Sequence, residues 1–531
     1  MTYVQEQAAG SALPTVWWLG YWRAGEHLYW WTTVVSRSAS PAAVAAAVRA
    51  RVSDGAWSTV TFAPDLTAGE GRRAAAGGSE AALLGAGAVS WDDVHPLVGR
   101  LTAGLPGSVA EETDTHVRRL QGQLEEIGDT IAGPPDELGP VVQRIAIYTE
   151  LAALEQREFH ASLERAWSGP LVERAANCDL FGRLGTLLFP SVLREYLASF
   201  EPTETPATTV VVAPGPDLGQ VPWELLTVRD DDTRAVEVAF IQGGLSPASL
   251  VNLARPAARD VPDGPALRII DPTGVSRDSE ASPIYPHGVP QSWTTRQRGL
   301  DAGVPTAGEL PQRPEASGQR GVQPRGCTRE EFGAILQERD WARVLFFGHV
   351  DSGDALSPTT SALRFNATSP RGEHRRPLRT EDGRLLEEPA GMHALSARVW
   401  LHAPDWWPMP RRVAIIACQA DDSRYVEQAG LTLAAVNAGA RIVTTTRWTC
   451  PTDQSVSFVG DVVLPGEGAT TAMALAVDTA HGSADPVSAI RAWQCDRLAV
   501  WRSARTPQEA RRAAPLVWAA PMTYALPDTV R

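Results

Sequence analysis

A histidine and a cysteine each follow a short apolar run in the C-terminal half of the chain. His349 ends the run ARVLFFGH (342–349), and Cys418 lies near the end of RRVAIIACQ (411–419). Such runs predict buried β-strands, and the carboxyl ends of parallel strands meet at one edge of a sheet. At that edge an imidazole would lower the pKa of a thiol and protonate a leaving amine. The pair could then form and resolve a thioester with a peptide carbonyl.

Each of these two residues also has a structural interpretation. Free cysteine is among the most buried residue types, so Cys418 could be a packing residue, and a lone histidine at a strand end is usually structural. Turn residues follow both of them, DSGD after His349 and QADD after Cys418. Taken on these residues alone, a nucleophile and a packing residue stay open as alternatives.

A third polar side chain is predicted at the same edge. Asp453 follows the run ARIVTTTRW (440–448), where its carboxylate could bind a cationic side chain. The alternative is an aspartate favoured by the dipole of a helix. We interpret Cys450 as a packing residue. His393 and His402 have no suitably spaced carboxylates or cysteines nearby, so we expect neither a metal ion nor a cofactor.

The composition limits the possible partners. The chain has 531 residues, 48 positive and 62 negative side chains, and a formal net charge of −14. All the positive side chains are arginine, which excludes chemistry that needs a lysine and is typical of a GC-rich genome. The acidic charge disfavours nucleic acid and anionic membranes. Because no membrane-spanning run, secretory signal or cysteine framework is found, we expect a cytoplasmic protein.

The elements that would position these residues alternate between strands and helices. Predicted strands cover 208–214, 267–272, 342–349, 411–419 and 440–448, and helical patterns such as TREEFGAILQ lie between several of them. This order indicates an α/β fold with a mostly parallel sheet covered on both faces.

The remaining segments are less regular. Residues 15–35 predict a tryptophan-rich β-hairpin that packs under helices, and 110–200 predict helices. Residues 273–326 and 366–410 are rich in Pro, Gly, Arg and Ser, and we expect them to form long surface loops.

Nine segments occur in an order that is hard to obtain by chance. They are LGTLLFPSVLREYL (184–197), VVVAPGPDLGQVPWELL (210–226), GLSPASLVNL (244–253), RIIDPTG (268–274), FFGHVDSGDALSPTTSALRF (346–365), VAIIACQAD (413–421), LTLAAVNAGARIVTTTRWTCPTDQSV (431–456), DPVSAIRAWQ (485–494) and PLVWAAPMTYA (515–525). In this order they resemble the motifs of the CHAT domain, a family in the caspase and separase clan of cysteine peptidases. The resemblance is to a bacterial member of the family, and because the sequence contains no repeat of fixed period, we expect no tetratricopeptide repeats.

The resemblance implies a fold and a division of the chain. The expected fold is a caspase-like three-layer α/β/α sandwich with a mostly parallel central sheet, preceded by a smaller α+β N-terminal region. Residues 185–531 would form the CHAT domain. Residues 1–184 would form the N-terminal hairpin and helical region, which could also belong to a degenerate second caspase-like unit.

The resemblance also implies roles for individual residues. Cys418 would be the nucleophile and His349 the general base and acid. The backbone N–H groups of Cys418 and Val350 would form the oxyanion site. Three aspartates would be candidates for the floor of a pocket that favours a basic residue before the scissile bond: Asp453, Asp421 and Asp422.

The implied function is a regulated cysteine endopeptidase. Its partners would be a protein substrate and a protein activator or regulator, with no nucleic acid and no membrane bound directly. Val350 stands where relatives often carry glycine, and the segment before the cysteine is long. These two departures leave a catalytically silent scaffold that binds a protein partner as the alternative.

Overall fold

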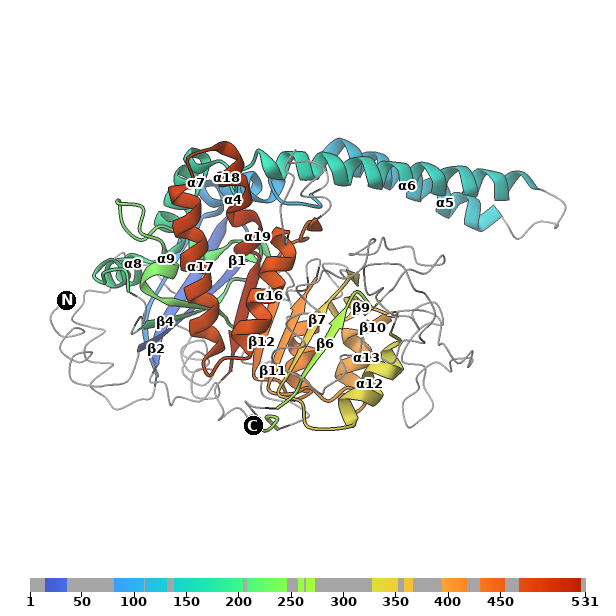
Figure 1. Cartoon of the computed structure of the whole chain (residues 1–531). Helices are drawn as coiled ribbons and strands as arrows, with labels where there is room; N and C mark the ends of the chain where they lie inside the picture. Colours follow the sequence, from blue (N-terminus) through green and yellow to red (C-terminus); the bar gives the residue numbers. More distant parts are fainter. Residues whose placement is uncertain are drawn as a thin grey trace.

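The computed structural model describes most of the chain, shown in Figure 1. The described residues are 15–35, 81–108, 110–130, 138–203, 206, 208–245, 256–261, 264–272, 327–351, 358–365, 394–417, 420, 430–453 and 468–526. Their strands form two five-stranded sheets and one small three-stranded sheet.

The C-terminal sheet carries the predicted site and is mostly parallel. Its strand order is β13-β12-β11-β7-β6. Strands β6, β7, β11 and β12 are parallel, and only β13 at one edge runs antiparallel to its neighbour. The mostly parallel sheet predicted from the sequence is confirmed. The strand bounds are β6 Ala266–Ile270, β7 Arg343–Phe347, β11 Arg412–Ile416, β12 Ile442–Thr446 and β13 Pro521–Ala525.

The N-terminal sheet contains the predicted hairpin. Strands β1 (Thr15–Ala24) and β2 (His27–Val35) pair in antiparallel register, and Gly25 takes a φ of +60° in the turn between them. Strand β3 (Ala81–Ser90) flanks β2, while β4 (Thr208–Ala213) and β5 (Phe240–Gly243) continue the sheet beyond β1 as parallel strands. Within the hairpin, Trp17 and Trp18 are buried, in agreement with the packing interpretation.

The strand predicted at 208–214 forms, but it belongs to a different sheet from the predicted one. The alternation of predicted strands and helices indicates that this strand belongs to the same parallel sheet as the others. In the structure, β4 pairs with β1 instead. The apolar run TTVVVA suits a strand buried on both faces in either sheet, so its composition does not identify its neighbour. The hairpin and residues 208–243 therefore share one sheet, although the predicted division of the chain at 184/185 lies between them.

Helices cover both faces of the C-terminal sheet. Helix α16 (Ala469–His481) packs on one face, where it contacts β11 and β7. Helices α12 (Arg329–Gln337) and α13 (Ala397–His402) lie on the side of the sheet away from α16 (Figure 1), and α14 (Leu431–Asn437) packs against α13 and β12. Alternation along β7 explains this, because Arg343 reaches α16 whereas the Phe346 ring meets the Phe365 ring edge-on at the other face.

One loop prediction is wrong in part. Residues 366–410 were predicted to form a surface loop, but Ala394–Ser396 form β10 and the next six residues form α13. Strand β10 joins β9 (Ala362–Arg364) and β8 (Val350–Asp351) in the small sheet. Trp400 is 1% exposed, and burial of such apolar side chains overrides the loop-like composition around them. Residues 273–326 and 366–393 lie outside the described residues.

The helical pattern at 110–200 is confirmed. Helices α5 (Glu111–Thr130) and α6 (Leu138–Trp167) run side by side and project from the two sheets (Figure 1). The other helices of at least four residues in the described part of the chain are α4 Trp91–Ala103, α7 Arg174–Leu188, α8 Ser191–Ala198, α9 Ala235–Val238, α17 Pro486–Ser503, α18 Pro507–Arg512 and α19 Pro515–Trp518. No helix within the described ranges is long and apolar enough to cross a bilayer.

The two large sheets meet where β5 lies beside β13. A Cβ atom on Gly243 would come within 2.4 Å of the Tyr524 ring, so the two strands approach closely. A buried ion pair joins the sheets as well: Arg447 Nη2 donates to both carboxylate oxygens of Glu224, at 2.7 and 2.8 Å. Glu224 lies in the short 3₁₀ helix Trp223–Leu225. Breaking such a buried pair costs several kcal/mol, about 3–5, which favours one fixed arrangement of the two sheets.

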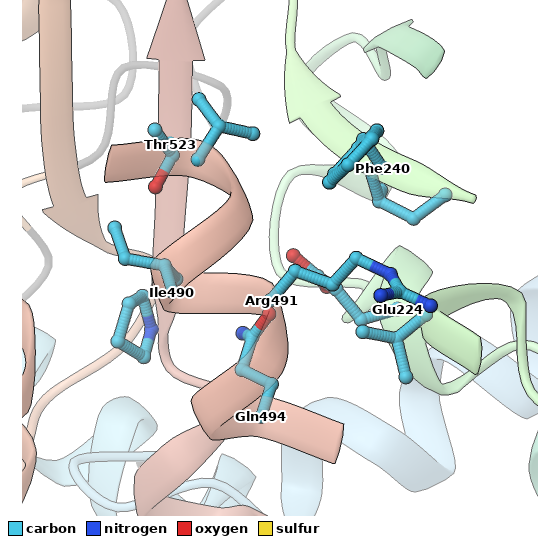
Figure 2. A pocket seen from close by; sticks show the side chains of 10 residues that line it. Glu224, Phe240, Ile490, Arg491, Gln494 and Thr523 are labelled. Atoms are coloured by element: carbon cyan, nitrogen blue, oxygen red, sulfur yellow. The ribbon is translucent and has the colours of Figure 1, made fainter. Parts of the chain in front are cut away.

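The cavity at this junction is too small for a ligand. Figure 2 shows Glu224, Phe240, Arg491 and Gln494 around it, and the volume is ≈ 10 Å³. This is about the space of one water molecule. The guanidinium of Arg491 stacks 5.5 Å from the centre of the Phe240 ring. The junction is therefore a packed interface and not a binding pocket.

A buried charged cluster fixes α16 on the C-terminal sheet. Asp478 of α16 accepts hydrogen bonds from Arg268 Nε of β6 (2.9 Å) and from Arg343 Nε of β7 (3.2 Å). Arg412 Nη1 of β11 donates to the carbonyl oxygen of His481, at 3.0 Å, in the last turn of the helix. An arginine at this helix terminus donates to carbonyl groups that have no partner within the helix. Its positive charge also interacts favourably with the negative end of the helix dipole.

His481 is buried beside these arginines and should be neutral. Its Nε2 shares a 2.8 Å hydrogen bond with the Thr444 hydroxyl, and its Nδ1 has no partner among the described residues. The pKa of His481 is lowered to about 3, chiefly by burial; the nearby Arg343 and Arg412 contribute to this lowering, and Asp478 opposes it. Between pH 6.5 and 3, therefore, a proton binds the unfolded chain and not the folded one at this position.

This histidine predicts a loss of stability in mild acid. Below pH 6.5 the free energy of unfolding should fall by about 1.4 kcal/mol per pH unit through His481, or about 2 kcal/mol between pH 7 and 5. Urea unfolding at several pH values measures this. His481→Gln should flatten the dependence relative to the unmodified protein, and His402→Gln, at an exposed position of α13, should not. Parallel pH curves for all three proteins would exclude His481 as the cause.

Candidate active site

His349 lies at the carboxyl end of β7 and is held by backbone hydrogen bonds on both sides. The Gly348 N–H donates to the carbonyl oxygen of Ile416 at 3.3 Å, and the His349 carbonyl oxygen accepts from the Arg364 N–H at 2.9 Å. The residue is half-buried. Strand β7 thus ends at the edge of the sheet predicted from the sequence, and its last turn is tied to β11.

The end of β11 reaches the same edge. Ile416 pairs with Phe347 in parallel register, so His349 and Cys418 each follow a paired residue by two positions. Neighbouring strands lie about 4.8 Å apart. The Ala417 N–H donates to the Thr446 hydroxyl at 3.2 Å, and this hydroxyl also hydrogen-bonds the Ala417 carbonyl oxygen. Cys418 itself lies outside the described residues, and the chain that leads to it is fixed by β7 on one side and β12 on the other.

A buried aspartate at this edge was not found by sequence reasoning. Asp271 follows β6 directly, is 0% exposed, and takes a φ of +47°. Its N–H donates to the Phe347 carbonyl oxygen at 2.7 Å, which brings it beside the turn that holds His349. Applying the strand-end rule to RIIDP, as it was applied to the runs before His349 and Cys418, would have identified it.

The Val350 side chain is packed and not exposed at the edge. Val350 begins β8, pairs with Leu363 of β9 and is 8% exposed. Its side chain belongs to the hydrophobic core. Since every residue except proline carries a backbone N–H, a valine at this position still offers one to an oxyanion. The role of Val350 in an oxyanion site stays a prediction.

The structure places the Asp453 carboxylate at the amino end of α16. It accepts from the Thr470 N–H at 2.9 Å, from the Thr471 N–H at 3.3 Å and from the Thr471 hydroxyl at 2.5 Å. Gly468 occupies the N-cap and has no side chain to do this. Asp453 therefore caps the helix from another part of the chain, which agrees with the helix-dipole interpretation. Its role in substrate recognition stays a prediction, and Asp421 and Asp422 lie outside the described residues.

The four described cysteines are free thiols. Cys327 is buried, and burial raises the pKa of the Cys495 thiol, so neither has the properties of a nucleophile. Cys450 is half-buried and its thiol points to the Trp448 carbonyl oxygen at 3.8 Å, in agreement with a packing residue.

Comparison with known families gives one match. The family model described as CHAT domain matches residues 179–526. The matched residues include both strands of the candidate site, and they begin within α7. A search of curated proteins finds no significant match.

The cap by Asp453 predicts a specific conflict at Gly468. A Cβ atom on Gly468 would lie 1.9 Å from Asp453 Cγ, so Gly468→Ala must displace the carboxylate and should cost about 1–3 kcal/mol of unfolding free energy. Asp453→Ala should cost about 1–2 kcal/mol through loss of the cap. Urea unfolding measures both values.

A double mutant separates the cap from general effects. With Asp453→Ala already present, Gly468→Ala should cost much less, because its colliding partner is gone. Gly182→Ala is the matched control, since Gly182 lies in α7 and an added Cβ would meet nothing within 4 Å. Additive losses at 453 and 468 would rule out the capping contact.

Proposed function

Because this chain belongs to the CHAT domain family, which lies in the caspase-like peptidase clan, we propose that it is a cysteine endopeptidase. It would cleave a peptide bond in a partner protein with Cys418 as nucleophile and His349 as general base and acid. The observation that supports this most directly is the parallel register of Ile416 with Phe347, two residues before each member of the pair.

The proposed reaction has two steps. The Cys418 thiol, deprotonated beside His349, attacks the scissile carbonyl carbon, and the C–N bond breaks as the imidazolium protonates the leaving amine. Water then attacks the thioester with His349 as base, which releases the carboxylate product and the thiol. The backbone N–H groups of Cys418 and Val350 are the proposed donors to the oxyanion in both steps.

The finer fold is part of the same proposal. A caspase-like three-layer α/β/α arrangement is supported by four parallel strands with α16 on one face and α12 and α13 on the other. We also propose that the N-terminal sheet, to which β1 and β4 belong, supports this unit. The buried ion pair of Glu224 and Arg447 connects the two.

A preference for a basic residue before the scissile bond is part of the same proposal. Asp453 is near the edge, but its carboxylate is shared with the amino end of α16. Asp421 and Asp422, which follow Cys418 closely, are proposed for the same role. An acidic side chain in the pocket would attract arginine or lysine and repel acidic residues. A protein activator or regulator is proposed as a second partner, by resemblance to the family.

The test is a comparison of protein fragments. The full-length protein is incubated with extract of its own cells, and newly formed N-termini are identified by mass spectrometry. The unmodified protein should produce fragments that the Cys418→Ala and His349→Ala variants do not. Loss of either side chain should lower the rate of peptide-bond cleavage by about 10²-fold or more. Cys450→Ala is the matched control, a thiol after the neighbouring strand that should be dispensable.

The residues before the cleavage sites test the basic preference. Arginine or lysine should be the most frequent residue directly before the cleaved bond. One of the variants Asp421→Asn, Asp422→Asn and Asp453→Asn should abolish that preference. Equal fragments from the unmodified protein and Cys418→Ala would contradict the proposed enzyme and favour the catalytically silent scaffold.

A further inference from the structure

The Thr446 hydroxyl continues the pairing of β11 with β12 beyond the last backbone pair of these strands. That pairing ends at Ile415 and Thr445. Further along, the Ala417 N–H donates to the Thr446 hydroxyl at 3.2 Å, and this hydroxyl donates to the Ala417 carbonyl oxygen. One side chain thus satisfies both backbone polar groups of the residue before Cys418. The contact therefore fixes the peptide bond that leads to Cys418.

Arg447, the residue after Thr446, is buried and held by several acceptors. Its Nη1 donates to the Ala519 carbonyl oxygen at 2.8 Å, and its backbone N–H donates to the Ala520 carbonyl oxygen at 3.0 Å. Its Nη2 donates to both carboxylate oxygens of Glu224. Within the described part of the chain, Glu224 is the only carboxylate that forms an ion pair with Arg447. Glu224 therefore compensates the buried charge that follows β12.

Glu224 is held in place by the N-terminal part of the molecule. The neighbouring Trp223 is buried, and its ring lies 5.3 Å from the Tyr21 ring of β1. On the other side, Arg234 Nη1 donates to the Leu225 carbonyl oxygen at 2.6 Å. These contacts fix both flanks of Glu224, so the unit built around the N-terminal sheet presents its carboxylate at a defined position beside the end of β12.

The surroundings of the ion pair leave little room to hydrate an unpaired charge. The cavity beside Glu224 has a volume of ≈ 10 Å³, about the space of one water molecule (Figure 2). Without the carboxylate, the Arg447 guanidinium would be an uncompensated buried charge, which is costly. Moving the guanidinium toward solvent would relieve this cost. Because Arg447 and Thr446 share a peptide bond, the same movement would displace the hydroxyl that holds Ala417.

We propose that Glu224 is a positioning residue for the candidate nucleophile. Through Arg447 it keeps Thr446 in contact with the chain that leads to Cys418, so the N-terminal part of the molecule completes the site. As a statement about reactivity, this rests on the proposed peptidase; the effect on the chain before Cys418 does not.

Hydrogen exchange tests the positioning without catalysis. The amide of Ala417 is compared with that of Val413, in the middle of β11, by mass spectrometry of the full-length protein. The ratio of the two exchange rates separates local opening from global unfolding. It should rise about tenfold in Glu224→Gln, which keeps the shape of the side chain and removes its charge.

The matched control is Glu237→Gln. Glu237 belongs to the same part of the chain and pairs with Arg502 at 2.7 Å. The exchange ratio should stay constant in this variant. Glu224→Asp keeps the charge but is one methylene shorter; it should give a smaller rise, and it replaces Glu224→Gln if that variant does not fold. An unchanged ratio in the variants at Glu224, or an equal rise in Glu237→Gln, would overturn the positioning role.

Labelling of Cys418 tests the consequence for reactivity. A peptide with arginine as its last residue and a thiol-reactive group at its carboxyl end is titrated. Glu224→Gln should lower the maximal labelling rate about tenfold or more with a nearly unchanged half-saturating concentration, because the peptide still binds while the thiol is displaced. Glu237→Gln should keep the normal rate. Adding Arg447→Met to Glu224→Gln removes the unpaired charge and should restore most of the rate.

The outcomes separate this proposal from the proposed function. A normal maximal rate in Glu224→Gln, an equal loss in Glu237→Gln, or no recovery with Arg447→Met would each contradict the positioning role. No labelling of the unmodified protein, or labelling that does not need His349, would contradict the peptidase. In that case the exchange ratio would still decide whether Glu224 positions the chain before Cys418.

Discussion

The parallel register of β7 with β11 is the constraint on which the candidate site depends. It sets Phe347 opposite Ile416, and a slip by one residue would turn each following side chain to the other face of the sheet. The Gly348–Ile416 hydrogen bond fixes the turn before His349, and Thr446 fixes Ala417 from the other neighbouring strand. The proposed chemistry needs a thiol and an imidazole at one edge of the sheet. This register brings the ends of β7 and β11, which precede His349 and Cys418, to the same edge.

Buried polar contacts keep that register by fixing α16 across three strands. Asp478 pairs with arginines of β6 and β7, and Arg412 of β11 binds the last turn of the helix. Asp453 caps the other end of α16, next to the candidate site. Since an uncompensated buried charge is costly, one arrangement of strands and helix satisfies these groups together. The pair of Glu224 and Arg447 extends the same principle to the second sheet.

Much of this could be predicted from the sequence because strand ends have a local signature. The apolar runs before His349, Cys418 and Asp453 predicted three strands and the edge that they share. The strand that pairs with β4 is set by contacts between distant parts of the chain, which local composition does not encode. The loop-like composition hid β10 and α13, whose burial depends on neighbours distant in sequence. The cap by Asp453 likewise depends on a contact between elements distant in the chain, so only the structure reveals it.

The most direct measurement is labelling of Cys418 by a peptide with a thiol-reactive group at its carboxyl end and arginine as its last residue. Intact-mass spectrometry of the full-length protein should show one added peptide on Cys418, at a rate that falls about 10²-fold or more in His349→Ala. Arginine in the peptide should give faster labelling than aspartate. Labelling at the same rate with and without His349, or distributed over the other cysteines, would contradict a dyad at the ends of β7 and β11.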